Sequence, residues 1–151
     1  MRAPPNGAEG HASAPRGEPG EPTDVVLIVD DDEAFREVVA ELVVEEGLAP
    51  VAAANGRQAL ELLVSGLRPI AILLDMMMPV MDGPAFRKEQ LAMESARSIP
   101  VAVTSASGLS RQQIAGLFGD VDFLPKPAGG AAVVAFLQRC RSKAVAALTP
   151  R

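Results

Sequence analysis

The chain has 151 residues, a formal net charge of −5 and neither Trp nor Tyr, and its pI lies near 4.9. An acidic protein repels nucleic-acid backbones and anionic membranes, and without Trp and Tyr it is poorly equipped to stack on bases, so we expect neither kind of partner. The single cysteine, Cys140, excludes an internal disulfide and any multi-cysteine metal site.

Residues 1–23 are rich in Pro, Gly and Ala and show no periodic apolar pattern. Such a segment cannot bury enough apolar surface to offset its conformational entropy, so it is predicted to be a disordered tail. Its His11 is interpreted as a solvated side chain rather than as a ligand. The tail lacks the apolar stretch of a secretion signal, and no later run approaches the ~20 residues of a membrane span. We therefore expect a cytoplasmic protein.

From Asp24 onward, short apolar runs alternate with amphipathic segments. The runs have the length of buried strands, which are predicted at Val25–Val29, Leu48–Ala54, Ile70–Leu74, Ile99–Thr104 and Val121–Leu124. The segments between them have helical spacing, which predicts helices at Ala34–Val43, Gly56–Val64, Pro84–Met93, Ser110–Phe118 and Ala128–Leu148. Continuously apolar strands are typical of a parallel sheet that is covered on both faces. We expect one α/β domain over residues 24–148, followed by a short C-terminal end at 149–151.

Polar residues follow four of the predicted strands. Asp30 and Asp31 come after the first strand, Asp75 after the third, Thr104 closes the fourth and Lys126 follows the fifth. The carboxyl ends of strands in a doubly wound sheet form the ligand crevice, so these groups are expected to meet there. Three carboxylates favour a bound Mg²⁺, which leaves coordination positions for phosphate oxygens, and a lysine and a hydroxyl suit the remaining oxygens. The pattern indicates phosphoryl transfer onto a carboxylate.

A simpler interpretation is that aspartates after strands cap the helices that follow. We favour this interpretation for Asp32 and Asp82 taken singly. For the five polar groups together, in this order along the chain, we favour the phosphoryl site.

Four motifs, VLIVDDDE, LLDMMMPVMDG, PVAVTSAS and DFLPKP, resemble those of the receiver domain of bacterial two-component response regulators, over about residues 24–148. The resemblance implies a flavodoxin-like, doubly wound five-stranded parallel sheet in the order 2-1-3-4-5, with five helices. It also implies that the domain is a phosphoacceptor in signalling rather than an enzyme with turnover.

The resemblance assigns a role to each matched residue. Asp75 would be the phosphoacceptor. Mg²⁺ (or Mn²⁺) would be held by Asp30, Asp31, Asp75 and the backbone carbonyl of Met77. Lys126 would pair with Asp75 at rest and bind the phosphoryl group afterwards.

The same resemblance extends to a conformational switch. Thr104 would bind the phosphoryl group and move towards it, which vacates space for the ring of Phe123. The alternative, that Phe123 is a core residue in both states, stays open. The peptide bond between Lys126 and Pro127 would be cis, an isomer that is accessible at an X-Pro bond.

Three positions bear on the lifetime of the phosphoryl group. Ser105 stands where the family usually has Ala, a small change that should leave the pocket intact. Met77 and Ala106 occupy variable positions that control water access, and neither carries an acid or amide that could position a water. We therefore expect no strong built-in dephosphorylation.

Because the chain ends soon after the last predicted helix, we expect a single-domain response regulator without an output domain. It would receive a phosphoryl group from a histidine kinase or a histidine phosphotransfer protein and dock to an unknown protein target. It would be a monomer or a phosphorylation-dependent dimer. The run Ala131–Leu137 is apolar on more than one face, and whether it packs inward or binds a partner stays open.

Two other functions stay open. One is a receiver-like adaptor that binds its partners regardless of phosphorylation. The other is a phosphatase of the haloacid dehalogenase type, which would have its nucleophile in the first acidic cluster, as in Asp30 with Asp32 two residues on. That phosphatase would also need an acidic pair after the lysine, and no acidic residue follows Lys126.

Overall fold

The computed structural model describes residues 24–126 and 129–148. The predictions for the tail, for Pro127 and for residues 149–151 lie outside the described residues.

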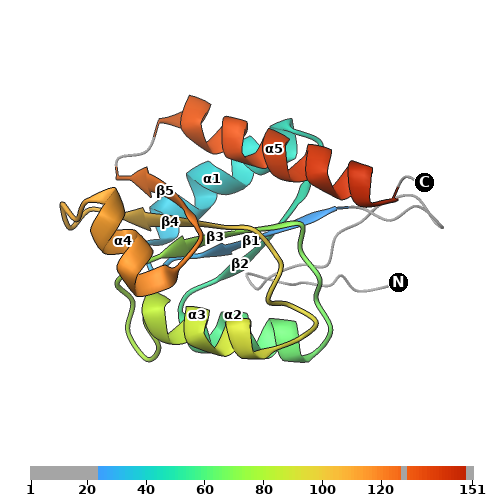
Figure 1. Ribbon diagram of the computed structural model, residues 1–151. Helices are drawn as coiled ribbons and strands as arrows, with labels where there is room; N and C mark the ends of the chain where they lie inside the picture. The colour runs from blue at the N-terminus through green and yellow to red at the C-terminus, as the bar shows by residue number, and fades with distance from the viewer. Residues whose placement is uncertain (1–23, 127–128, 149–151) are drawn as a thin grey trace, which may run out of the picture.

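A five-stranded parallel sheet forms the centre of the domain, with its strands in the order β2-β1-β3-β4-β5 (Figure 1). The strands are β1 Val25–Val29, β2 Ala49–Ala53, β3 Ala71–Asp75, β4 Val101–Ser105 and β5 Asp122–Pro125. All residues of β1, β3 and β4 are buried, because each of these strands has neighbours on both edges and helices on both faces. The predicted fold and strand order are confirmed.

Helices cover both faces of the sheet: α1 and α5 lie on one side, and α2, α3 and α4 on the other (Figure 1). The helices are α1 Glu33–Glu45, α2 Gly56–Val64, α3 Gly83–Ala92, α4 Arg111–Phe118 and α5 Gly130–Leu148. Two apolar layers result, one under each set of helices. The run Ala131–Leu137 contributes Val133, Phe136 and Leu137 to the α1 and α5 layer, so burial explains part of its apolar character. None of the helices in the described part of the chain is long and apolar enough to span a membrane.

Aspartates in the loops after β1 and β3 start the helices that follow. The Asp32 carboxylate accepts hydrogen bonds from the backbone N–H groups of Ala34 and Phe35, and the Asp82 carboxylate accepts one from Ala85. Both residues are N-caps, so the capping interpretation is confirmed for them. The two helices therefore begin close after the edge of the sheet where the parallel strands end.

Candidate phosphoryl-transfer site

Three carboxylates meet at the carboxyl edge of β1 and β3. An oxygen of each of Asp30, Asp31 and Asp75 lies within 4.8 Å of the others. Asp30 is 1% exposed and Asp75 is 6% exposed, because both leave strands that are buried on both faces. Asp31 is exposed. Hard oxygen donors at this spacing suit a divalent cation, and an open side towards solvent leaves room for water and phosphate ligands.

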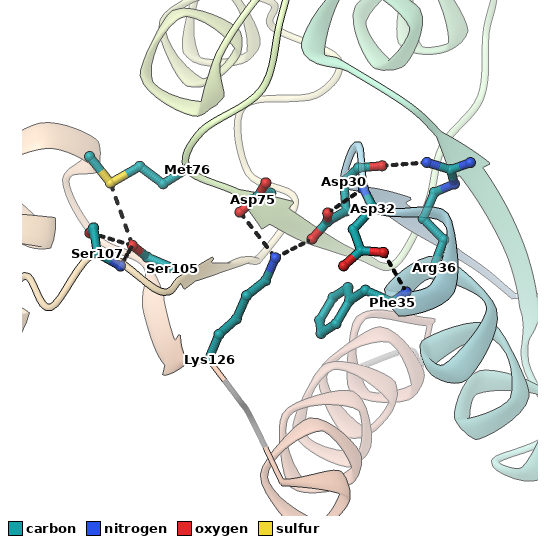
Figure 2. A network of polar contacts seen from close by, with 9 residues as sticks. All are labelled: Asp30, Asp32, Phe35, Arg36, Asp75, Met76, Ser105, Ser107 and Lys126. Carbon is teal, nitrogen blue, oxygen red and sulfur yellow. Dashed lines mark hydrogen bonds and ion pairs between the residues drawn. The ribbon is translucent and has the colours of Figure 1, made fainter.

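Lys126 brings a positive charge to the buried carboxylates from the end of β5. Its Nζ lies 2.8 Å from Oδ2 of Asp30 and 3.4 Å from Oδ1 of Asp75 (Figure 2). The pair with Asp75 that the sequence predicts is therefore present, but the shorter contact is to Asp30. The ammonium group also lies 4.5 Å from the centre of the Phe35 ring, a cation–π contact that orients the side chain.

The site shifts the pKa values of its own groups. The pKa of Asp75 is raised from 3.8 to about 6; burial is the largest cause, the charge of Asp30 adds to it, and Lys126 opposes it. Burial alone would lower the pKa of Lys126, but its hydrogen bonds and charge interactions with Asp30 and Asp75 raise it overall. Asp75 thus remains mostly ionised at neutral pH, as a nucleophile requires, yet its charge is poorly compensated by the protein alone.

Every polar atom of Asp30 has a partner. Its backbone N–H donates to the carbonyl of Ala53 over 3.1 Å. Its Oδ1 accepts from the N–H of Asp32 over 2.9 Å, and its Oδ2 accepts from Lys126. Its carbonyl accepts from Nη1 of Arg36 over 2.7 Å. Asp30 is therefore the rigid member of the cluster.

The end of β4 supplies a hydroxyl without a partner. Thr104 is 1% exposed, and its Oγ1 is the buried side-chain oxygen or nitrogen that lacks a hydrogen bond among the described residues. A buried hydroxyl without a hydrogen-bond partner destabilises the fold, so it indicates a ligand that supplies this partner. The donor set fits a phosphoryl group bridged to a metal: carboxylates for the metal, a lysine and a hydroxyl for phosphate oxygens.

Ser105 joins the neighbouring loops to this strand. Its carbonyl accepts from the backbone N–H of Lys126 over 2.8 Å. Its hydroxyl lies 2.6 Å from that of Ser107 and accepts from the Ser107 N–H over 3.1 Å (Figure 2). Ser105 therefore connects the segment after β4 to the end of β5, and the expectation that it leaves the pocket intact stays a prediction.

The loop after Asp75 is tight at two places. A Cβ atom on Gly83 would lie 2.6 Å from the carbonyl oxygen of Asp75, so only glycine allows this approach. Val80 has φ of 70°, a conformation that is strained for a β-branched residue, and the Met81 N–H donates to the carbonyl of Pro79 across it over 2.7 Å. The backbone of this loop forms the wall behind the candidate nucleophile.

Phe123, the predicted switch residue, is buried, whereas Met77, the predicted carbonyl ligand, has an exposed side chain. Phe123 is 9% exposed and packs in the apolar layer that contains Ile114 and Phe118 of α4. The Met77 side chain is 65% exposed, so it is not held in the core. The metal role of the Met77 carbonyl and the switch role of Phe123 both stay predictions.

Comparison with known proteins decides the family. The family model of the response regulator receiver domain matches residues 26–138, three quarters of the chain. The chain belongs to the response regulator receiver domain family. This confirms the resemblance that the four motifs indicate.

Solved receiver domains share both the fold and about a quarter of the sequence. The receiver domain of the Francisella response regulator 1452 is 27% identical, with a TM-score of 0.70, over 81% of this chain and 99% of that one. The receiver domain of the sensor histidine kinase PA1611 from Pseudomonas aeruginosa PAO1 is 28% identical, with a TM-score of 0.69, over 78% of this chain and 97% of that one. That structure has a magnesium ion coordinated in its active site cleft.

A curated relative is longer than this chain. Response regulator MprA of Mycolicibacterium vanbaalenii is 37% identical over 103 residues, which is 68% of this chain but 43% of that protein. The match therefore covers less than half the length of that relative. It concerns the receiver domain and not the remainder of MprA.

Sequence reasoning missed several polar residues of this receiver domain. Arg36 donates a hydrogen bond to the Asp30 carbonyl. The sequence hints at this contact only through the unusual place of a basic residue in the first turn of a helix. On α3, Arg87 is 6% exposed and donates to the carbonyls of Phe118 and Asp120 and to the amide oxygen of Gln90. Burial lowers the pKa of Arg87. No feature of the sequence predicts the hydrogen bonds of this residue.

Proposed function

We propose that the receiver domain accepts a phosphoryl group on Asp75 from a histidine kinase or a histidine phosphotransfer protein, and signals by phosphorylation-dependent docking to a protein target. The observation that carries this proposal is the buried Asp75 carboxylate among Asp30, Asp31 and Lys126. Thr104, whose buried hydroxyl is unpaired, lies opposite Asp75 in the register of the neighbouring strand β4. We place this signalling in the cytoplasm.

The transfer step balances without a further reactant. A carboxylate oxygen of Asp75 attacks the phosphorus of a phosphohistidine, and an acyl phosphate P–O bond forms. The P–N bond breaks and its electron pair stays on the ring nitrogen. If the other ring nitrogen of the phosphohistidine carries a proton, the leaving group is a neutral histidine side chain.

The residues of the site would have separate roles in binding the metal and the phosphoryl group. Asp30, Asp31 and Asp75 would hold Mg²⁺, with the Met77 carbonyl as a further ligand. When bound, Mg²⁺ supplies Lewis-acid stabilisation of the charge on the phosphoryl oxygens. Lys126 would move its ion pair from the carboxylates to a phosphoryl oxygen.

The output would begin at Thr104. Its hydroxyl would donate to a phosphoryl oxygen, the one partner that its buried position lacks at rest. This movement would vacate space near Phe123 and alter its packing against α4, and thereby the surface that a target binds. Phe carries no hydroxyl, so the readout would depend on ring position alone.

Acetyl phosphate labelling tests the proposal. The protein is incubated with Mg²⁺ and acetyl phosphate, and its intact mass is followed with and without EDTA. We expect one phosphoryl addition that depends on Mg²⁺, is absent in Asp75→Asn and remains in Asp82→Asn, a capping residue outside the cluster. An unlabelled protein that still binds its partners would favour the adaptor, and turnover of phosphate esters that depends on Asp30 would favour the phosphatase.

A further inference from the structure

The guanidinium of Arg36 donates a hydrogen bond to a main-chain oxygen at the candidate metal site. Its Nη1 donates to the carbonyl of Asp30 over 2.7 Å (Figure 2). Within the described part of the chain it forms no ion pair, although Glu33 and Glu37 are exposed on the same helix. Its position is therefore not explained by a surface salt bridge.

The place of Arg36 in α1 is electrostatically unfavourable. The helix begins at Glu33, so Arg36 lies at the end of the first turn. The N-terminal turn of a helix is the positive end of its dipole and favours acidic side chains. The charge-assisted hydrogen bond to the Asp30 carbonyl offsets this unfavourable placement.

The peptide that Arg36 holds is the one that leads into Asp31. The Asp31 carboxylate is exposed and has neither a hydrogen bond nor an ion pair among the residues that the structure describes, yet its oxygen lies within 4.8 Å of those of Asp30 and Asp75. Its direction thus depends on the backbone. Because the peptide unit is planar, fixing the Asp30 carbonyl also fixes the N–H and Cα of Asp31.

We propose that Arg36 is a positioning residue for the metal site, which holds the Asp30–Asp31 peptide so that the free Asp31 carboxylate faces the buried carboxylate of Asp75. This rests on the proposed function only in that the cluster binds Mg²⁺. Residues that orient metal ligands without touching the metal commonly change metal affinity by about 10–100-fold when they are removed.

Simple electrostatics predicts the opposite sign, which makes the proposal testable. Arg36 is a cation near a cation site, so its removal would strengthen metal binding if charge alone mattered. If Arg36 positions Asp31, its removal weakens binding despite the lost repulsion. The sign of the change in affinity therefore separates the two roles.

The experiment measures metal binding directly, without phosphoryl transfer. Mn²⁺ is titrated into the full chain and free Mn²⁺ is followed by electron paramagnetic resonance, with Mg²⁺ as competitor. Arg36→Met is compared with Arg36→Lys, which keeps the charge, and with Arg57→Met, which removes an exposed arginine on α2. Urea unfolding in EDTA verifies that each variant is folded.

We expect Arg36→Met to raise the Kd for Mn²⁺ and for Mg²⁺ by about tenfold, Arg36→Lys to restore most of the affinity, and Arg57→Met to change little. At saturating Mg²⁺, Arg36→Met should be labelled by acetyl phosphate at nearly the wild-type rate, because its defect lies in metal affinity. Equal or tighter metal binding by folded Arg36→Met would overturn the positioning role. Failure of the proposed function has a separate signature: a folded wild-type protein that binds Mn²⁺ and loses affinity in Arg36→Met, but takes up no phosphoryl group from acetyl phosphate.

Discussion

The buried charge of Asp75 should destabilise the receiver domain in the absence of metal, and Asp75→Asn should reveal this. The pKa of Asp75 is raised from 3.8 to about 6, first by burial and then by the charge of Asp30. A group whose pKa is higher in the folded state favours folding at pH values below its unfolded pKa. That contribution is lost as the pH rises through the folded pKa.

The magnitude follows from the size of this shift. About two pKa units correspond to roughly 3 kcal/mol at about 1.4 kcal/mol per unit. The penalty is absent below about pH 4, develops between about pH 4 and 6 and is complete above about pH 7. Asn removes the charge but weakens the contact with Lys126, which offsets about 1 kcal/mol. Asp75→Asn should therefore stabilise the protein by about 1–3 kcal/mol at pH 8.

Urea unfolding of wild type and Asp75→Asn in EDTA, at pH 4 and pH 8, measures this difference. The gain should be present at pH 8 and nearly absent at pH 4. Asp31→Asn is the matched control: its carboxylate is exposed and keeps its water, so it should gain less than about 1 kcal/mol. Mg²⁺ at about 100 times its Kd should stabilise wild type by about 2.7 kcal/mol and so reduce or reverse the advantage of Asp75→Asn. The reasoning is refuted if Asp75→Asn is no more stable than wild type at pH 8, or if its advantage is as large at pH 4.

Three further substitutions test features around the site by urea unfolding. Arg87→Met should lower the free energy of unfolding by roughly 2–4 kcal/mol, because the buried carbonyl of Phe118, the part-buried carbonyl of Asp120 and Gln90 lose a donor; a loss below about 0.5 kcal/mol would mean that the network is dispensable. Val80→Gly should be neutral or stabilising by up to about 1 kcal/mol, because it relieves a strained φ of 70° at an exposed position, and a clear loss would contradict the strain. Gly83→Ala should lower the free energy of unfolding by about 1–3 kcal/mol and slow acetyl phosphate labelling, since its Cβ would clash with the Asp75 carbonyl. Labelling at the wild-type rate would show that the loop shifts to accommodate the methyl group.

The sequence alone predicts the sheet because its signals are local. Runs such as Val25–Val29 and Ile70–Leu74 are apolar without alternation, which requires burial on both faces, and short amphipathic helices separate them. Once the topology is known, the strand-end rule places Asp30, Asp75 and Lys126 at one edge, and the structure brings them together.

The contacts that the sequence did not reveal depend on side-chain direction across long separations. Arg87 lies 31 residues before Phe118, whose carbonyl it binds, and nothing in α3 distinguishes it from an exposed arginine. The closer approach of Lys126 to Asp30 than to Asp75 depends on differences of less than 1 Å. Propensity and periodicity carry no information at that scale.

The close approach at Gly83 bears on how this domain can be engineered. A side chain at position 83 would meet the backbone of Asp75 and Met76, so no substitution there can tune Asp75, the proposed phosphoacceptor, without displacing it. A library that aims to alter phosphoryl lifetime should leave position 83 fixed. Diversity belongs at Met77 and Ala106, which are exposed and can accept acids and amides without repacking the core.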